Sequence, residues 1–128
     1  MNVKFLNEYA KLPTKGSAYA AGYDLYAAIE EPMAIFPGAT VPVTTCLSME
    51  IPEDLFGAIF ARSGLAAKRG LRPANCVGVV DADYRGEIIV SLHNHSDEPQ
   101  TIEDKERVAQ LVLTPCFVAD FEEVDALS

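Results

Sequence analysis

Short apolar runs, rich in valine, isoleucine, phenylalanine and tyrosine, recur along this chain, and turn-forming residues separate them about every eight to twelve positions. Apolar and polar side chains alternate over residues 88–93, as in a strand with one buried face. Pro37 with Gly38, and residues 96–99, indicate turns. A chain of 128 residues fits one domain, so the pattern predicts a single all-β sandwich or barrel.

The expected strands are short and cover most of the chain. Their bounds are 2–6, 23–27, 34–36, 40–50, 55–61, 76–80, 87–94, 99–102, 108–117 and 121–124. One helical turn is expected over residues 63–69, with Ser63 as its N-cap and Gly70 as the glycine that follows its last residue. The backbone N–H groups at the start of such a turn attract phosphate.

The charge of the chain is acidic overall but unevenly distributed. The net charge is −9, whereas binding to nucleic acid or to an anionic membrane surface requires a basic face, so neither partner is expected. No lysine or arginine lies between Lys15 and Arg62, and five of the ten cations fall between Arg62 and Arg85. Such a cluster is either a solvated patch or a site for a small polyanion.

The cysteines and the N-terminus indicate the compartment. Cys46, Cys76 and Cys116 are odd in number and widely spaced, which excludes a disulfide framework or a zinc site and predicts buried free thiols. No apolar run is long enough for a signal peptide or a membrane span. The cytoplasm, or the host cytoplasm for a viral or phage protein, is expected.

His93 and His95 share one face of an expected strand and could chelate a metal. No carboxylate or cysteine at ligand spacing accompanies them, so no metal site is expected there. Neither lies near the segments described next, so no Ser-His-Asp or Cys-His catalytic set is indicated.

The densest chemical signal is the segment NCVGVVDADYRG, residues 75–86. Asp81 and Asp83 share a face in an extended chain, and a carboxylate beside a bound polyphosphate can deprotonate a water. A β-hairpin turn of no chemical significance would contain the same residue types. The spacing alone leaves both interpretations open.

A second segment, ARSGLAAKRG at residues 61–70, combines groups that suit phosphate. Arg62 offers bidentate donors, Ser63 a hydroxyl, and Gly64 close approach of the backbone. The segment is not a Walker A loop, because GxxxxGK[ST] is absent.

Two polar residues stand in otherwise apolar segments. Asp24, in AAGYDLYAA, would be costly to bury without a partner. The sequence is equally compatible with an ion pair to an arginine and with a functional role for this residue. Gln110, in RVAQLV, either faces solvent or contributes to a site.

Together and in this order, these segments resemble the four central motifs of the trimeric dUTPase family, over about residues 11–114. AAGYDLYAA resembles the first motif, ARSGLAAKRG the second, NCVGVVDADYRG the third and DKERVAQLV the fourth. The resemblance implies a jelly-roll-like β fold with one short helix, and a homotrimer whose sites are each built from all three subunits. It implies Mg²⁺-dependent hydrolysis of dUTP to dUMP and pyrophosphate, which limits uracil in DNA and supplies dUMP for dTMP synthesis.

The resemblance also assigns roles to individual residues. Asp81 would activate the water that attacks the α-phosphorus, and Tyr84 would stack under the sugar and exclude a ribose 2′-hydroxyl. Mg²⁺ would sit on the triphosphate, with Asp24 reaching it through water. The residues implied to contact uracil are Asn75, Gly78, Val79, Val80 and Ile89. Those implied to hold the phosphates, from a neighbouring subunit, are Arg62, Ser63, Gly64 and Gln110.

Two features depart from the family pattern. The fourth motif usually has a glycine where this chain has Lys105, and a left-handed lysine costs about 1 kcal/mol, so we expect that turn to be rearranged. No glycine follows Gly86, so residues 87–128 do not contain the family's C-terminal glycine-rich lid motif; either the sequence is truncated before it or omits it, or this variant lacks it. Without a lid, nucleotide binding is expected to survive and turnover to fall, because closure excludes water.

Two other functions are compatible with a dUTPase-like body. A dCTP deaminase shares the fold, but it needs a catalytic glutamate and groups that recognise the cytosine amine; release of ammonia from dCTP would identify it. A regulatory protein-interaction module would keep its partner after a charge-neutral substitution of Asp81, whereas an enzyme would lose hydrolysis.

Overall fold

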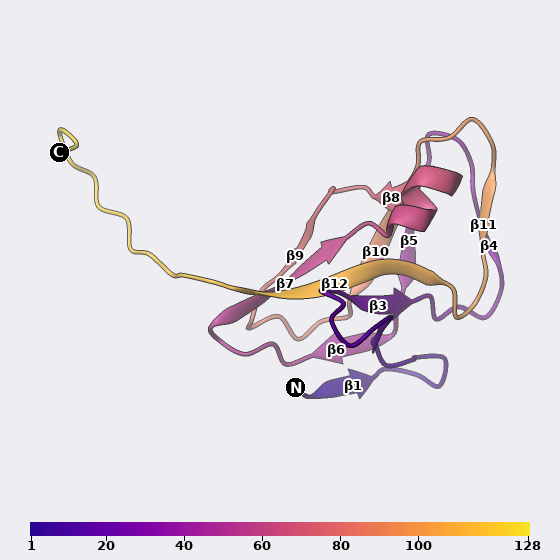
Figure 1. The fold of residues 1–128 in the computed structure, drawn as a ribbon, viewed down its shortest axis with the longest axis horizontal. Coiled ribbons are helices and arrows are strands. Elements are labelled where there is room, and N and C mark those ends of the chain that lie inside the picture. Colours follow the sequence, from indigo (N-terminus) through magenta and orange to yellow (C-terminus); the bar gives the residue numbers. More distant parts are fainter.

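The computed structural model describes all 128 residues and is built from antiparallel strands with one short helix (Figure 1). The largest sheet has five strands in the order β2 (Thr14–Lys15), β3 (Tyr23–Tyr26), β12 (Arg107–Pro115), β7 (Leu55–Phe60) and β9 (Gly78–Val80). The second sheet has the order β5 (Thr40–Thr44), β10 (Ile89–Asn94) and β8 (Leu71–Pro73). Two smaller pairs complete the body: β1 (Val3–Phe5) with β6 (Leu47–Met49), and β4 (Met33–Ile35) with β11 (Gln100–Ile102).

Strand periodicity places the core. In β10, Val90 and Leu92 are buried while Ile89 is exposed, as the alternation of the sequence predicts. Side chains from all the sheets join in one cluster of 22 buried residues, and the strands that carry them confirm the all-β class. A register irregularity between Arg107 and Ala109 lies at the start of β12, directly before the stretch that carries Gln110.

The expected strands occur with shifted ends. The 40–50 run is two strands, β5 and β6, because the backbone at Cys46 turns to a φ of 55°. The short strands β2 and β8 were not expected; each lies at the edge of its sheet. The helix η1 (Leu65–Arg69) follows Gly64 as N-cap without a side-chain cap, so the expectation of Ser63 as N-cap is wrong. Gly70 takes the predicted left-handed conformation, at a φ of 65°.

The turn before β12 keeps a left-handed residue. Lys105 has a φ of 64°, so the expectation of a rearranged turn is wrong. Its backbone N–H donates to Ala27 O at 2.9 Å, and its ammonium donates to Tyr9 O and lies 5.9 Å from the Tyr9 ring centroid. These contacts offset the conformational cost of a left-handed lysine.

The three cysteines differ in exposure. Cys46 is buried, whereas Cys76 and Cys116 are exposed, so the expectation of three buried thiols is wrong. Burial, and secondarily the Glu87 carboxylate, raise the pKa of the Cys46 thiol. The short helix η1 has five residues, and the chain has no helix with the length and hydrophobicity of a membrane span.

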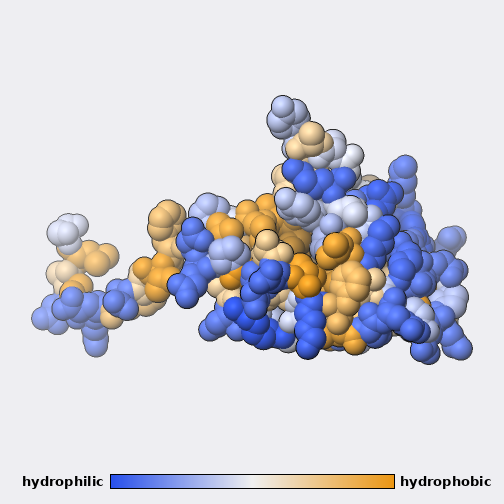
Figure 2. All heavy atoms as spheres, turned by 90° about the horizontal axis from the view of Figure 1, so that it is seen from below, coloured by the Kyte–Doolittle hydropathy of each residue, from blue (hydrophilic) through white to orange (hydrophobic).

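Residues 116–128 run away from the body (Figure 1). Their apolar side chains are exposed, including Phe117 at 95% and Phe121 at 99%, and Figure 2 shows orange atoms along this tail. The strand expected at 121–124 does not form, because a strand needs hydrogen-bonding partners and this segment has no neighbour within the chain.

Candidate active site

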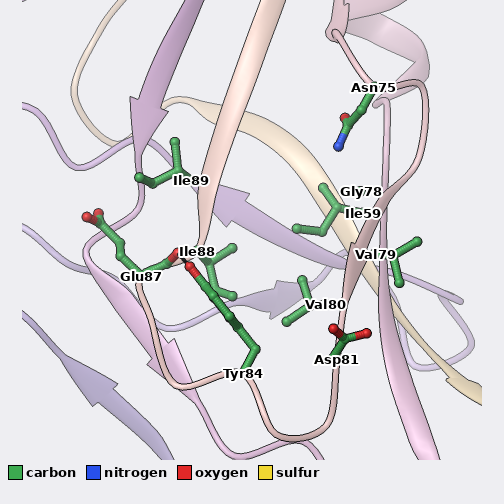
Figure 3. Close-up of a pocket in the computed structure, with 10 residues that line it drawn as sticks. All are labelled: Ile59, Asn75, Gly78, Val79, Val80, Asp81, Tyr84, Glu87, Ile88 and Ile89. Atoms are coloured by element: carbon green, nitrogen blue, oxygen red, sulfur yellow. Dashed lines mark hydrogen bonds between the residues drawn. The ribbon is translucent and has the colours of Figure 1, made fainter.

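A cavity of about 210 Å³ opens where β9 ends and β10 begins (Figure 3). Its lining residues are Ile59, Asn75, Gly78, Val79, Val80, Asp81, Tyr84, Glu87, Ile88 and Ile89. Seven of these are residues to which the family resemblance assigned contacts with uracil, with the deoxyribose or with the attacking water. We call this cavity the base half.

The strand β9 gives the base half its polar edge. It is the last strand of the five-stranded sheet and pairs only with β7, so its outer edge has no strand partner. Unpaired N–H and C=O groups of an edge strand can pair with a planar polar ring as they would with another strand. The Asn75 amide adds a donor and an acceptor beside them (Figure 3).

Asp81 follows β9 directly and is exposed, and no ion pair engages its carboxylate. Its carbonyl accepts a hydrogen bond from the Tyr84 N–H at 3.1 Å, which forms a tight turn and places the Tyr84 ring in the same cavity. Asp83 does not line the base half. The structure therefore singles out Asp81 from the two acids as the one in the cavity.

A second concavity of about 230 Å³ gathers the cationic and amide groups, and we call it the phosphate half. It is lined by Gly16, Ala20, Gly22, Asp24, Arg62, Ser63, Arg107 and Gln110. Gly64 does not line it but adjoins Ser63 in the chain. Two guanidinium groups and a hydroxyl in one concavity suit a polyanion.

Asp24 organises the phosphate half. Its Oδ1 accepts from Arg62 Nε at 2.9 Å, and its Oδ2 lies 3.7 Å from an Arg107 guanidinium nitrogen. The ion pair with an arginine is therefore present, and it orients Arg62. Gln110 pairs with Asp24 across β12 and β3, and its amide donates to Ala61 O at 2.9 Å, so it is not merely a solvent-facing residue.

The residues offer no complete metal cage. No group of three or more His, Cys, Asp or Glu side chains is placed to hold an ion, and His93 Nδ1 pairs with the Thr40 hydroxyl at 3.0 Å. The single carboxylate of Asp24 fits Mg²⁺ that keeps its waters and takes its other ligands from phosphate.

Seven lining residues were missed by the sequence reasoning, and three of them are the small residues Gly16, Ala20 and Gly22. Arg107 and Glu87 lie in or beside the segments already singled out, so their charge could have marked them. Ile59 and Ile88 are ordinary strand residues, and only the pairing of β7 with β9 and the start of β10 bring them to the cavity.

The two halves share no residue, and Asp81 in the base half and Arg62 in the phosphate half lie near opposite ends of β7. Val80, next to Asp81, pairs with Gly57, whereas Arg62 follows the far end of that strand. Five residues of extended chain span about 17 Å. Within one chain, the backbones of Asp81 and Arg62 are therefore separated by most of the length of β7.

Comparison with known proteins gives consistent findings. The family model for dUTPase matches residues 8–128. The chain is similar to the deoxyuridine 5′-triphosphate nucleotidohydrolase of Desulfitobacterium hafniense strain DCB-2, at 47% identity over 118 residues, which are 91% of this chain and 78% of that protein.

Among solved structures, the chain is similar to the dUTPase of Staphylococcus bacteriophage 80alpha, with a TM-score of 0.90 and 25% identity over 99% of this chain and 97% of that one. That phage enzyme has also been solved with dUpNHpp. A variant of the dUTPase of phage phi11 of S. aureus, solved with a structural Mg(II) ion, matches in fold with a TM-score of 0.88 and 24% identity over 98% of this chain and 96% of that one.

Proposed function

Because the chain belongs to the dUTPase family and is a dUTP diphosphatase, we propose that Asp81 is the general base of the reaction. The observation that carries this role is an exposed carboxylate, without an ion pair, at the wall of the base half. Its oxygen accepts a proton from a water whose oxygen attacks the α-phosphorus. The bond from that phosphorus to the bridging oxygen breaks, and pyrophosphate leaves.

The base half is proposed to select deoxyuridine. Asn75 and the free edge of Gly78, Val79 and Val80 would pair with uracil, while Ile89 closes the pocket. A close-fitting pocket would exclude thymine through a clash with its methyl group. Tyr84 would lie under the sugar and leave no room for a ribose 2′-hydroxyl.

The phosphate half is proposed to serve the base half of another subunit in a homotrimer. The separation of about 17 Å along the backbone between the position opposite Val80 and Arg62 supports this, because one nucleotide needs both Asp81 and Arg62 at once. Arg62, Ser63, Gly64 and Gln110 would hold the phosphates. The exposed apolar tail also supports assembly, because a second copy would cover it.

Mg²⁺ is proposed as the cofactor, and the single carboxylate of Asp24 beside two arginines supports an ion borne mainly by phosphate. When bound, Mg²⁺ supplies charge neutralisation on the triphosphate. We further propose that residues 1–128 act as one dUTPase-like domain in the cytoplasm, which the single core and the three free thiols support.

Calorimetric titration with a non-hydrolysable dUTP analogue and Mg²⁺ tests the pocket. Selective binding of about one analogue per chain is expected, with weaker binding of the UTP, dTTP and dCTP equivalents. Equal binding of all four would refute the base assignments. Asp81→Asn should lower kcat by about 10²–10⁴-fold while it retains analogue binding, and unchanged turnover would refute the role of Asp81.

Subunit mixing tests the shared site. Asp81→Asn and Arg62→Ala should each be nearly inactive. Trimers reassembled from equal amounts of the two should recover about a quarter of the wild-type sites, because a site then takes Asp81 and Arg62 from different chains. No recovery after demonstrated subunit exchange would mean that each chain works alone.

A further inference from the structure

Residues 85–88, which follow the Tyr84 turn, are hydrogen-bonded to residues 45–48, the bend after β5 and the start of β6. Four hydrogen bonds join the two segments, and we call them the seam. They run from Thr45 Oγ1 to Ile88 O at 2.5 Å, from Cys46 N to Glu87 Oε2 at 3.0 Å, from Ile88 N to Leu47 O at 2.8 Å and from Ser48 Oγ to Arg85 O at 2.6 Å.

Residues 45–47, to which this segment is hydrogen-bonded, are held in place by burial. Thr45 and Leu47 have no exposed surface, and Cys46 is 7% exposed. Cys46 has a φ of 55°, and its N–H points to the Glu87 carboxylate. A carboxylate that accepts from a backbone N–H forms a stronger bond than a neutral acceptor does, and a nearly buried N–H without a partner is unfavourable.

The seam fixes the atom that holds Tyr84. The Tyr84 hydroxyl donates to the Glu87 carbonyl oxygen at 2.8 Å, although 44% of Tyr84 is exposed. The ring also occupies the space beside Gly86, where an added Cβ would lie 2.5 Å from the Tyr84 oxygen and 2.7 Å from its Cζ. The ring is thus held at its hydroxyl by Glu87 and has room only because residue 86 lacks a side chain.

We propose that Glu87 is a positioning residue for sugar selection: its side chain bonds to Cys46, its carbonyl holds the Tyr84 hydroxyl, and the fixed ring excludes a 2′-hydroxyl. This inference rests on the proposed role of Tyr84. A loosened ring can move aside for a ribose, whereas a fixed one cannot. Glu87 also lines the base half, but its side chain points away from Asp81 (Figure 3), so its contribution runs through Tyr84.

The test is the ratio of kcat/KM for dUTP to kcat/KM for UTP. Glu87→Ala is expected to lower the ratio about tenfold, which corresponds to about 1.4 kcal/mol of transition-state discrimination. Glu87→Gln keeps an oxygen for the Cys46 N–H and should retain most of the ratio. Gly86→Ala should lower the ratio as well, because its methyl group displaces the ring. The matched control is Glu50→Ala, which removes a glutamate that accepts from Asn2 at 3.0 Å, outside the cavity.

Hydrogen exchange of the Cys46 amide gives a readout that does not depend on catalysis, and it should be faster in Glu87→Ala than in the wild type. If Glu87→Ala lowers both kcat/KM values equally, or leaves the ratio unchanged in a folded protein, Glu87 has no role in sugar selection. If Glu87→Gln loses as much of the ratio as Glu87→Ala, the carboxylate acts by charge and the proposal is also wrong. A wild type that does not discriminate, or a Tyr84→Ala variant with an unchanged ratio, would instead refute the role of Tyr84.

Discussion

Substitution of Gly22, which lines the phosphate half, by alanine should displace Gln110 and so damage that half. A Cβ on Gly22 would lie 2.4 Å from Gln110 Oε1 and 3.1 Å from its Cβ and Cδ. Gly22 does not have a positive φ, so alanine brings no backbone strain there. The amide of Gln110 must therefore move, and its 2.9 Å hydrogen bond to Ala61 O is lost.

The size of the effect follows from these contacts. The clash falls on the far end of a flexible side chain, so its relief should cost no more than about 1 kcal/mol; loss of a partly buried hydrogen bond costs about 1 kcal/mol, and the lower entropy of the unfolded alanine chain offsets about 0.4–1 kcal/mol. We expect a net loss of about 1 kcal/mol, or roughly 4 °C in Tm. Because hydrogen bonds to a charged group contribute about 1.5–3 kcal/mol, kcat/KM for dUTP should fall about 10–100-fold.

Thermal unfolding and steady-state hydrolysis of dUTP measure both effects. Gly16→Ala is the matched control, since Gly16 lines the same concavity with nothing within 4 Å of an added Cβ. In a Gln110→Ala background, Gly22→Ala should cause little further loss of activity, because the group it displaces is already gone. If Gly22→Ala behaves like Gly16→Ala, or if its effect is additive with Gln110→Ala, the reasoning is refuted.

Three further predictions concern stability and are checked by urea unfolding. Lys105→Ala should lower the free energy of unfolding by about 1 kcal/mol, because alanine has the same strain at the left-handed φ as lysine and lacks the hydrogen bond to Tyr9. Lys105→Gly should stay within about 0.5 kcal/mol of the wild type, because relief of that strain offsets the lost hydrogen bond; equal losses in the two variants would contradict this. Asn94→Ala should lose about 3 kcal/mol, because this fully buried amide bonds to Ile35 O and Glu98 O and accepts from Ser96; a loss below about 1 kcal/mol would contradict it. The pKa of Cys46 is raised above its ordinary value of 9.0, so the unfolded chain loses that proton first and stability should fall as the pH rises above 9.0; Cys46→Ala should show a smaller alkaline loss, and an identical pH profile would exclude this contribution.

The parts of the fold that could be predicted depend on neighbours in the chain. Alternation over residues 88–93 identified β10 and its buried face, since side chains two apart share a face of a strand. The left-handed conformation of Gly70 could also be predicted locally, because glycine has no Cβ to clash with the backbone in that conformation. The segments around Asp81 and Arg62 also carried enough chemistry to mark both halves of the site.

Where the predictions were wrong, the local structure depended on contacts with residues distant in the sequence. The strand expected at 121–124 has the right residues but no strand to pair with, and Lys105 keeps its φ of 64° because Ala27 and Tyr9, far away in the chain, supply partners for its nitrogens. Local propensity contains no information about such contacts.

The sequence by itself determined the residue types of the site, the all-β class and the family, because these follow from local pattern and motif. Only the tertiary structure decided that Asp24 holds Arg62 across 38 positions, that Glu87 bonds to Cys46 across 41, and that Asp81 and Arg62 lie at opposite ends of β7. The physical reason is that strand register and turns bring these distant segments together: a shift of one residue in β3 would send Asp24 to the other face of its sheet, and register is fixed by the packing of the whole core.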